Sequence, residues 1–212
     1  EPKMQSGRGV WCLLAIGLAY GIPSFWEAGR SRDLDTQDLS SPSVPFVWKM
    51  CSPPDVPMKL TNLTIAPSPI VISKTKTTSI KLAVEASLGA PIDLGTSVEL
   101  LVKKRVPYTT TYEKIPCVDH WGSCLYPDLC LQLKEHMPVC NDWFEKHNVS
   151  CHCPFAPQSV SASESVYTVP AAGKLLPGWL ADGDFQTEVT VRDAKGSVMG
   201  CLFTQFSLNM VP

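Results

Sequence analysis

Several features that define common protein classes are missing from this sequence. Apart from one short run near the N-terminus, no apolar stretch approaches the roughly 20 residues that a transmembrane helix needs. Charged residues make up only 18% of the chain, the formal net charge is −2, and the Lys and Arg residues form no basic stripe. Since nucleic-acid binding depends on clustered positive charge, we expect no nucleic-acid partner.

Signatures of a hydrolase or of a metal centre are also scarce. No G-x-S-x-G nucleophile elbow occurs, and the nearest alternative, the Gly-Ser-Cys run at 122–124 after His120, ends in a cysteine that we expect to be bridged. The run Cys151-His152-Cys153 either binds zinc or contributes to disulfides, and a zinc site needs a second ligand pair at matching spacing. The other histidines are scattered without such a pair. We therefore expect no catalytic residues, no bound metal and no cofactor.

Residues 1–24 have the three-part pattern of a secretory signal peptide. A polar stretch with Arg8 precedes a short apolar run, and small residues follow it as at a peptidase site. Met4 is the natural start, so we interpret the residues before it as upstream sequence. Residues 25–47 are rich in Ser, Asp and Pro without helical or strand periodicity, and we predict a flexible lead-in or pro-segment. The folded domain is predicted to span residues 48–212.

The cysteine count agrees with a secretory route. Nine cysteines occur, and Cys12 lies in the predicted signal peptide, which leaves eight. An even number in this compartment predicts four disulfides, although their pairing is open. Because Cys151 and Cys153 flank a single residue, a bond between them would be strained, so each is expected to bond elsewhere. N-glycosylation sequons at Asn62 and Asn148 suit the same compartment.

The chain after Cys51 has mainly the two-residue period of β-strands. Residues 79–88 place an apolar side chain at every second position, which is typical of a half-buried strand. Other strand candidates are 60–65, 70–72, 98–106, 166–169, 185–192 and 197–208, and a turn at 193–196 joins the last two into a hairpin. Residues 126–137, within the cysteine-rich stretch, have a helical spacing. We predict an all-β fold, an antiparallel β-sandwich or cup with one short helix.

One predicted loop is unusually apolar. Residues 170–184 contain prolines and glycines that oppose regular structure, yet they carry Leu175, Leu176, Trp179 and Leu180. Loops usually run over the surface, and leaving such side chains in water forfeits about 1.5–3 kcal/mol for each. One interpretation is that the loop folds back and fills the core. The other is that it lines the mouth of an apolar cavity and dips into a membrane, which suits a Trp ring with its polar N–H.

Several motifs together resemble those of the ML (lipid-recognition β-cup) family and of its lysosomal ganglioside-activator members. They are Trp48-Lys49-Met50-Cys51, Lys114-Ile115-Pro116-Cys117, Asp119, Gly122-Ser123-Cys124, Cys130, Cys140, Cys151-His152-Cys153-Pro154-Phe155, Pro177-Gly178-Trp179-Leu180 and Gly200-Cys201. The match runs from about Phe46 to the C-terminus and includes the order and spacing of all eight cysteines. The resemblance implies an immunoglobulin-like β-cup with an apolar lipid cavity. It also implies the bridges Cys51–Cys201, Cys117–Cys124, Cys130–Cys153 and Cys140–Cys151.

The same resemblance implies a function and a set of contact residues. It favours the cavity interpretation of the loop with Trp179, and it places Tyr112 where the family presents a second exposed aromatic side chain. The implied protein is a non-enzymatic lipid-transfer protein, lysosomal with possible secretion. Such a protein extracts ganglioside GM2 or a related glycosphingolipid from a membrane surface, holds the ceramide in its cavity and presents the sugar to β-hexosaminidase A. The alternative is a secreted lipid-sensing co-receptor or recognition module of the same fold.

Overall fold

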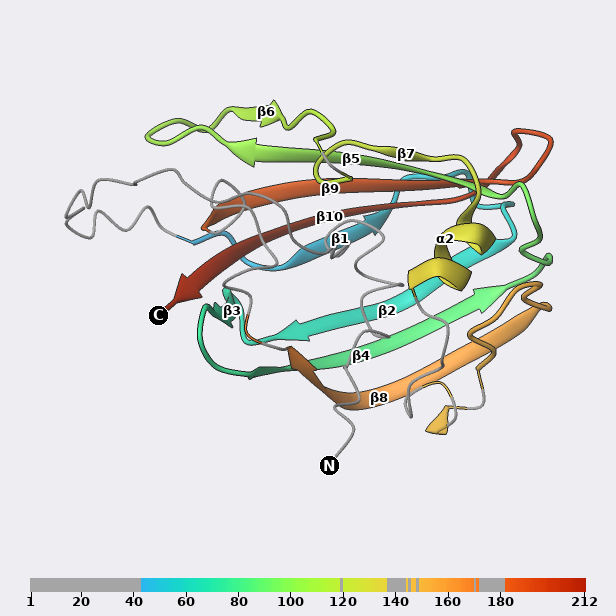
Figure 1. Ribbon diagram of the computed structural model, residues 1–212, viewed down its shortest axis with the longest axis horizontal. Helices are drawn as coiled ribbons and strands as arrows, with labels where there is room; N and C mark the ends of the chain where they lie inside the picture. Colours follow the sequence, from blue (N-terminus) through green and yellow to red (C-terminus); the bar gives the residue numbers. More distant parts are fainter. Residues whose placement is uncertain are drawn as a thin grey trace.

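The computed structural model describes residues 43–118, 120–136, 144, 146–147, 149–169, 171 and 182–212. In this part of the chain, two β-sheets form the two layers seen in Figure 1, with a short helix at one end. The larger sheet contains β1 (Val47–Met50), β3 (Ile70–Ser73), β5 (Ser97–Arg105), β6 (Tyr112–Lys114), β7 (Leu125–Tyr126), β9 (Gly183–Arg192) and β10 (Val198–Val211). The smaller sheet contains β2 (Met58–Ala66), β4 (Thr78–Leu88) and β8 (Gln158–Val169), and the helix α2 spans Leu129–His136.

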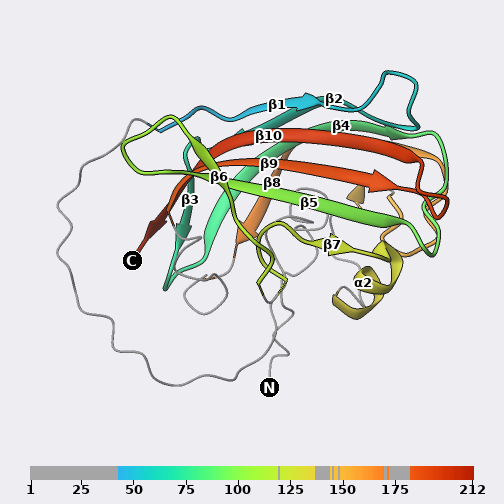
Figure 2. The same ribbon diagram turned by 90° about the horizontal axis from the view of Figure 1, so that it is seen from above.

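The larger sheet has the strand order β1-β10-β9-β5-β6, with β3 also paired to β10 and β7 to β5. Figure 2 shows β1, β10, β9 and β5 side by side in this order. The smaller sheet has the order β2-β4-β8. The described strand pairs are antiparallel except for β3 with β10, which is parallel. The predicted all-β sandwich is therefore confirmed, and its antiparallel character holds apart from this one pair.

The C-terminal hairpin forms as predicted. The side chain of Asp193 accepts hydrogen bonds from the backbone N–H groups of Lys195 and Ser197, at 2.9 and 2.8 Å. Gly196 has a φ of 84°, which a glycine adopts without the strain that a side chain would add. An aspartate that bonds the backbone two residues on is a turn-forming feature, so local chemistry sets the register of β9 and β10.

The short strands β1, β6 and β7 were not predicted, and the helix and β8 begin at other residues than predicted. The helix begins at Leu129 rather than at 126, because Asp128 caps it by accepting the backbone N–H of Leu131 at 3.0 Å, while Tyr126 belongs to β7. Strand β8 begins at Gln158, eight residues before the predicted start at Val166. Its first half alternates serine with small apolar residues, which is a weak strand signal.

Three disulfides lie within the described residues: Cys51–Cys201, Cys117–Cys124 and Cys130–Cys153. They are three of the four pairs that the family resemblance implies. Cys151 is disulfide-bonded too, whereas its expected partner, Cys140, lies outside the described residues. Both cysteines of the Cys151-His152-Cys153 run therefore serve disulfides, each with a partner other than its neighbour.

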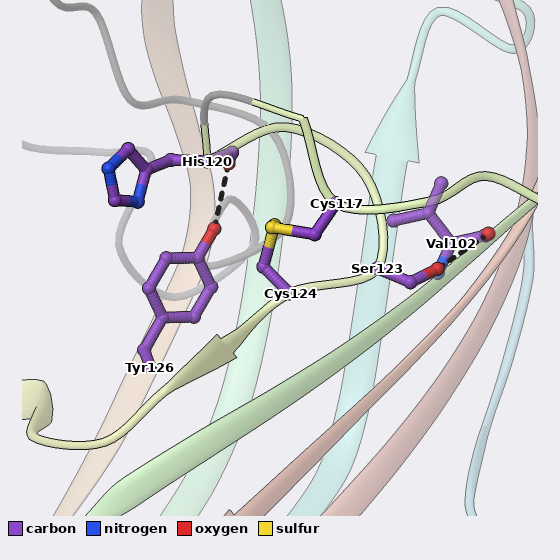
Figure 3. Close-up of a disulfide and its surroundings, with 6 residues drawn as sticks. All are labelled: Val102, Cys117, His120, Ser123, Cys124 and Tyr126. Carbon is purple, nitrogen blue, oxygen red and sulfur yellow. Dashed lines mark hydrogen bonds between the residues drawn. A yellow bond between two sulfur atoms is a disulfide. The ribbon is translucent and has the colours of Figure 1, made fainter.

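The Cys117–Cys124 bridge closes a short loop that is fastened to β5, as Figure 3 shows. The hydroxyl of Ser123 accepts the backbone N–H of Val102 at 2.9 Å and donates to the Val102 carbonyl at 3.0 Å. Gly122 has a φ of 95°, and a Cβ there would lie 2.2 Å from the carbonyl oxygen of Pro116. Only glycine fits this turn, so the loop conformation depends on it.

Buried apolar residues form two clusters rather than one. The larger cluster includes Val98, Leu100 and Phe185 of the larger sheet together with side chains of α2. The smaller cluster belongs to the other sheet and consists of Leu63, Leu82, Val84, Ala162 and Tyr167. The partly buried side chains of Phe46 and Ile80 pack against both clusters. The candidate site lies between these two clusters.

Candidate functional site

A cavity of about 230 Å³ lies between the two sheets. Its wall takes Leu133 and Val191 from the larger buried cluster and Leu82 and Val84 from the smaller one. Protein interiors are normally close-packed, and one water molecule occupies only about 30 Å³ of liquid volume. The hollow is therefore much larger than an ordinary packing defect.

The cavity wall is apolar along most of its length. It is formed by β2, β4 and β8 of the smaller sheet, β9 and β10 of the larger sheet, and α2. On β4 the lining runs from Leu82 to Leu88, which is about 20 Å at 3.3 Å per residue. That length suits an extended hydrocarbon chain.

The close approach of β10 and β2 shapes one side of this wall. Gly200 lines the cavity, and a Cβ at this position would lie 2.7 Å from the Cβ of Met58. Real Cβ atoms do not approach this closely, so any larger residue would push the two sheets apart. Gly200, which belongs to the family motif Gly200-Cys201, is therefore required by the close packing of β10 against β2.

Two polar residues line the cavity near the start of β8. Ser150 and Gln158 both line it, and the backbone N–H of Ser150 donates to the side-chain oxygen of Gln158 at 3.3 Å. Ser150 is exposed and Gln158 is half-buried.

A second group of polar side chains lies toward the other end of β8. Tyr167 lines the cavity, and Ser165 lies two residues before it on the same strand. Ser165 Oγ lies 3.2 Å from Nε2 of His147. Burial raises the pKa of Tyr167 far above its ordinary value, whereas the side chain of Ser165 acts in the opposite direction. No local sequence pattern links Ser165 to His147, because 18 positions separate them.

Tyr112, the second aromatic residue implied by the family resemblance, lies in β6. It is half-buried opposite Arg105 of β5. Burial raises the pKa of its phenol, and the nearby Asp184 carboxylate adds to this, while Arg105 lowers it by charge and a hydrogen bond. Arg105 Nη1 also forms an ion pair with Asp184 Oδ2 at 2.9 Å, and Ser207 donates a hydrogen bond to the same carboxylate. Tyr112 is thus tied into a polar network on the sheet.

The exposed aromatic residue of this hairpin is instead Tyr108. It lies in the β5–β6 turn with 82% of its surface exposed and a φ of 64°. Below the turn, Lys103 and Lys114 are directly opposite each other on the two strands. The strand pattern alone could not tell which tyrosine occupies the turn, because the turn position depends on the pairing register.

The remaining predicted site residues divide into two groups. Leu175, Leu176, Trp179 and Leu180, together with the sequon residue Asn148, lie outside the described residues. Asn62 lies in β2, half-buried, opposite the exposed Glu85 of β4 and therefore on the face of the smaller sheet that points away from the cavity. Its glycosylation stays a prediction.

Within the described residues, one group of cysteine and glutamate side chains has ligand atoms close enough for a metal ion, but its cysteines offer no free thiolate. Cys51, Glu188 and Cys201 have their ligand atoms within 4.8 Å of one another, but the two cysteines form a disulfide. Among the described residues, no helix is long and apolar enough to cross a membrane.

Solved structures of low sequence identity resemble the chain weakly. A Niemann-Pick type C2 protein from Japanese carpenter ant has 12% identity and a TM-score of 0.33, covering 77% of this chain and 99% of its own. Chicken MD-1 complexed with lipid IVa has 14% identity and a TM-score of 0.32, covering 76% of this chain and 88% of its own.

A ganglioside GM2 activator of Macaca fascicularis is 30% identical over 211 residues, 98% of this chain and 100% of the relative. A ganglioside GM2 activator of Mus musculus is 31% identical over 166 residues, 77% of this chain and 81% of the relative. Residues 45–208 match the ML domain. The chain therefore belongs to the ML domain family, and the relatives that it matches there are ganglioside GM2 activators.

Proposed function

We propose that this protein is a non-enzymatic lipid carrier of the lysosome or of the secreted space. It takes a glycosphingolipid such as ganglioside GM2 from a membrane, holds the ceramide between its two sheets and presents the sugar to β-hexosaminidase A. Membership of the ML domain family and the two ganglioside GM2 activator relatives support this proposal.

The observation that carries the proposal is the apolar cavity of about 230 Å³ between the sheets. Each methylene group that leaves water for such a cavity gains about 0.8 kcal/mol. A lipid in a membrane is already surrounded by hydrocarbon, so exchange between membrane and cavity is nearly balanced. A transfer protein needs this reversibility.

Contact with a membrane is the second requirement, and the β5–β6 hairpin suits it. Tyr108 combines an aromatic ring with a polar tip, which is the composition favoured at a membrane interface. Two like charges directly opposite on neighbouring strands repel each other, so the Lys103–Lys114 pair is better accommodated beside negative charge. Anionic lipid head groups supply such charge.

The proposal is tested by blocking the cavity. Val160 of β8 lines the cavity, and a tryptophan there would occupy the space of an acyl chain. We expect Val160→Trp to abolish the movement of fluorescent ganglioside GM2 between vesicles, which the delipidated wild-type protein should catalyse. The same variant should fail to increase the hydrolysis of vesicle-bound GM2 by β-hexosaminidase A.

Val166→Trp is the matched control. Val166 lies on the same strand, but 63% of its surface is exposed, so the larger side chain stays outside the cavity. Thermal unfolding of both variants checks that each is folded. Equal transfer by the two variants, or no transfer by the wild-type protein, would contradict the carrier function. If the protein transfers lipid but does not affect β-hexosaminidase A, it is a carrier that does not cooperate with this enzyme. That result would favour the alternative function, a lipid-sensing module.

A further inference from the structure

Two methionine side chains line the apolar cavity. Met50 is the last residue of β1 and Met58 the first residue of β2, and both are half-buried. The other two described methionines, Met199 and Met210, belong to or pack against the larger buried cluster and do not line the cavity. A thioether is soft and polarizable, and a two-electron oxidant converts it to a sulfoxide. Met50 and Met58 therefore give the cavity wall a chemical reactivity that hydrocarbon side chains lack.

The sulfur of Met58 lies against Gly200 of β10. A Cβ at position 200 would lie 3.5 Å from Sδ of Met58, and Gly200 itself lines the cavity. Because glycine has no side chain, nothing at this position covers that side of the sulfur. Met50 belongs to the same part of the wall, since it pairs with Leu202, two residues beyond Gly200.

Gln158 lies in the same row of the smaller sheet as Met58. Met58 pairs with Leu88 of β4, and Leu88 pairs with Gln158 of β8. All three residues line the cavity. Neighbouring strands lie about 4.8 Å apart, so roughly 10 Å separates the backbones of Met58 and Gln158. Two long side chains can reach a single ligand group from the two ends of such a row.

The amide group of Gln158 has a defined orientation. Its Oε1 accepts the backbone N–H of Ser150 at 3.3 Å, and this is the only hydrogen bond of the Gln158 side chain among the described residues. A backbone N–H can only donate, so the atom facing it is the oxygen, and the NH2 group of Gln158 remains to donate to a ligand. The row thus holds a hydrogen-bond donor and a thioether at the surface of an apolar cavity.

A saturated acyl chain makes no use of this donor, whereas an oxidised chain does. Unsaturated acyl chains form hydroperoxides, which place a polar group far along a hydrocarbon tail. Burying such a group without a hydrogen bond is costly, so it is best accommodated where the wall offers a partner. Gln158 offers one in the row of Met58.

We propose that Met58, with Met50 as a second reactive residue, reduces the hydroperoxide of an unsaturated acyl chain held in the cavity. The sulfur attacks the terminal oxygen, and the O–O bond breaks as the S–O bond forms. The proton of the hydroperoxide moves to the oxygen that stays on the chain, which becomes an alcohol. Each reaction consumes one methionine and yields one methionine sulfoxide, so the thioether is the reductant. Gln158 donates a hydrogen bond to the oxygen on which negative charge develops. This inference rests on the lipid-carrier function proposed above.

The test uses a ceramide whose linoleoyl chain carries a hydroperoxide, incubated with the full-length delipidated protein. Peptide mass spectrometry locates each added oxygen atom, and chromatography measures the alcohol product. We expect one alcohol for each sulfoxide, with Met58 oxidised at least about tenfold faster than Met210, because the cavity holds the two reactants together. Met210 is the internal control, since it is half-buried like Met58 but does not line the cavity. Hydrogen peroxide does not depend on the cavity for access, so it should oxidise the two residues at more similar rates.

Three variants locate the activity. Met58→Leu keeps a similar side-chain volume without the sulfur, so it should remove most of the alcohol product and leave the part that Met50 supplies. Met210→Leu is the matched control and should keep the wild-type yield. Gln158→Leu retains both cavity methionines and should slow the oxidation of Met58 by the lipid about three- to tenfold, the factor that one net hydrogen bond provides. Its reaction with hydrogen peroxide should be unchanged.

Different outcomes overturn this activity and the carrier function. A bound ceramide hydroperoxide that stays intact, with Met50 and Met58 unoxidised, would refute the activity while lipid binding stands. Oxidation of Met210 as fast as Met58 would refute it too, because the cavity would not direct the reaction. An unchanged rate in Gln158→Leu would overturn the role of Gln158. Failure of the folded wild-type protein to bind the ceramide at all would refute both proposals.

Discussion

Tyr126 illustrates how a single side chain responds to its surroundings. Its phenol donates a hydrogen bond to the His120 carbonyl at 2.9 Å, beside the Cys117–Cys124 bridge (Figure 3). Only 4% of its surface is exposed. Burial raises its pKa from 10.0 to about 12, because the charged phenolate would lose its hydration.

This pKa shift predicts an alkaline weakness. The unfolded chain releases the Tyr126 proton near pH 10 and the folded chain only near pH 12, so the stability contributed by this group is complete below pH 10 and falls as the pH rises toward 12. Tyr126→Phe should be about 1 kcal/mol less stable than the wild-type protein at neutral pH, through the lost hydrogen bond. Near pH 12 the difference should shrink or reverse. Denaturant unfolding across this pH range measures both, and a constant difference would contradict the shift.

At the scale of secondary-structure elements, two disulfides differ in what they hold together. Cys51–Cys201 joins the end of β1 to β10 across 150 residues, whereas Cys117–Cys124 closes a loop over 7 residues. A bridge stabilises mainly by restricting the unfolded chain, and this effect grows with the length of the closed loop. The first bridge also fastens the end of the four-residue strand β1 to its partner β10.

Removal of each bridge should therefore have a different cost. In the chain-entropy account, replacing Cys51 and Cys201 by alanine lowers the free energy of unfolding by up to about 5 kcal/mol, against about 2 kcal/mol for Cys117 and Cys124. Denaturant unfolding of the two double variants, side by side, gives the comparison. Equal losses, or a larger loss from the short loop, would mean that local packing rather than loop length dominates.

For the molecule as a whole, the cavity and the disulfides have opposing effects. A void of 230 Å³ costs about 5 kcal/mol at roughly 24 cal/mol for each Å³. The Cys51–Cys201 bridge contributes a similar amount in the opposite direction. A protein that keeps a hollow for a ligand thus has a physical reason to be cross-linked, and bound lipid should raise its stability further.

The arrangement of charge on the molecule yields a prediction about membranes. The β5–β6 hairpin and the β9–β10 turn lie at opposite ends of the larger sheet (Figure 1), and each carries an exposed lysine, Lys114 and Lys195. Lys114→Glu should weaken binding to vesicles that contain anionic lipid, whereas Lys195→Glu, the same change at the far end, should not. Tyr108→Ser should also weaken binding, and do so with neutral vesicles as well.

Salt provides the control for this experiment. At 1 M salt the Debye length falls to about 3 Å, so the effect of Lys114→Glu should largely vanish while that of Tyr108→Ser persists. Vesicle sedimentation measures all the variants under both conditions. Equal weakening by Lys114→Glu and Lys195→Glu would mean that net charge, and not the hairpin, determines binding.

Local features of the chain were predictable because they depend on near neighbours. The two-residue period located β4, β5, β9 and β10, and Asp193 with Gly196 located the turn between the last two. The first half of β8 was missed because serine and alanine give little strand preference. The helix start was placed too early because the capping role of Asp128 competes with the helical spacing around it.

The sequence by itself determined the cysteines available for bridges, the strand periods and the family, and its predicted secretory signal stays a prediction. Only the tertiary structure decided that the two sheets leave a cavity between their buried clusters, that Ser165 meets His147, and that Tyr108 rather than Tyr112 occupies the hairpin turn. The reason is physical: periodicity and capping act over a few residues along the chain. A cavity depends on the spacing and side-chain volumes of strands that are distant in sequence. No local sequence pattern predicts this combined effect.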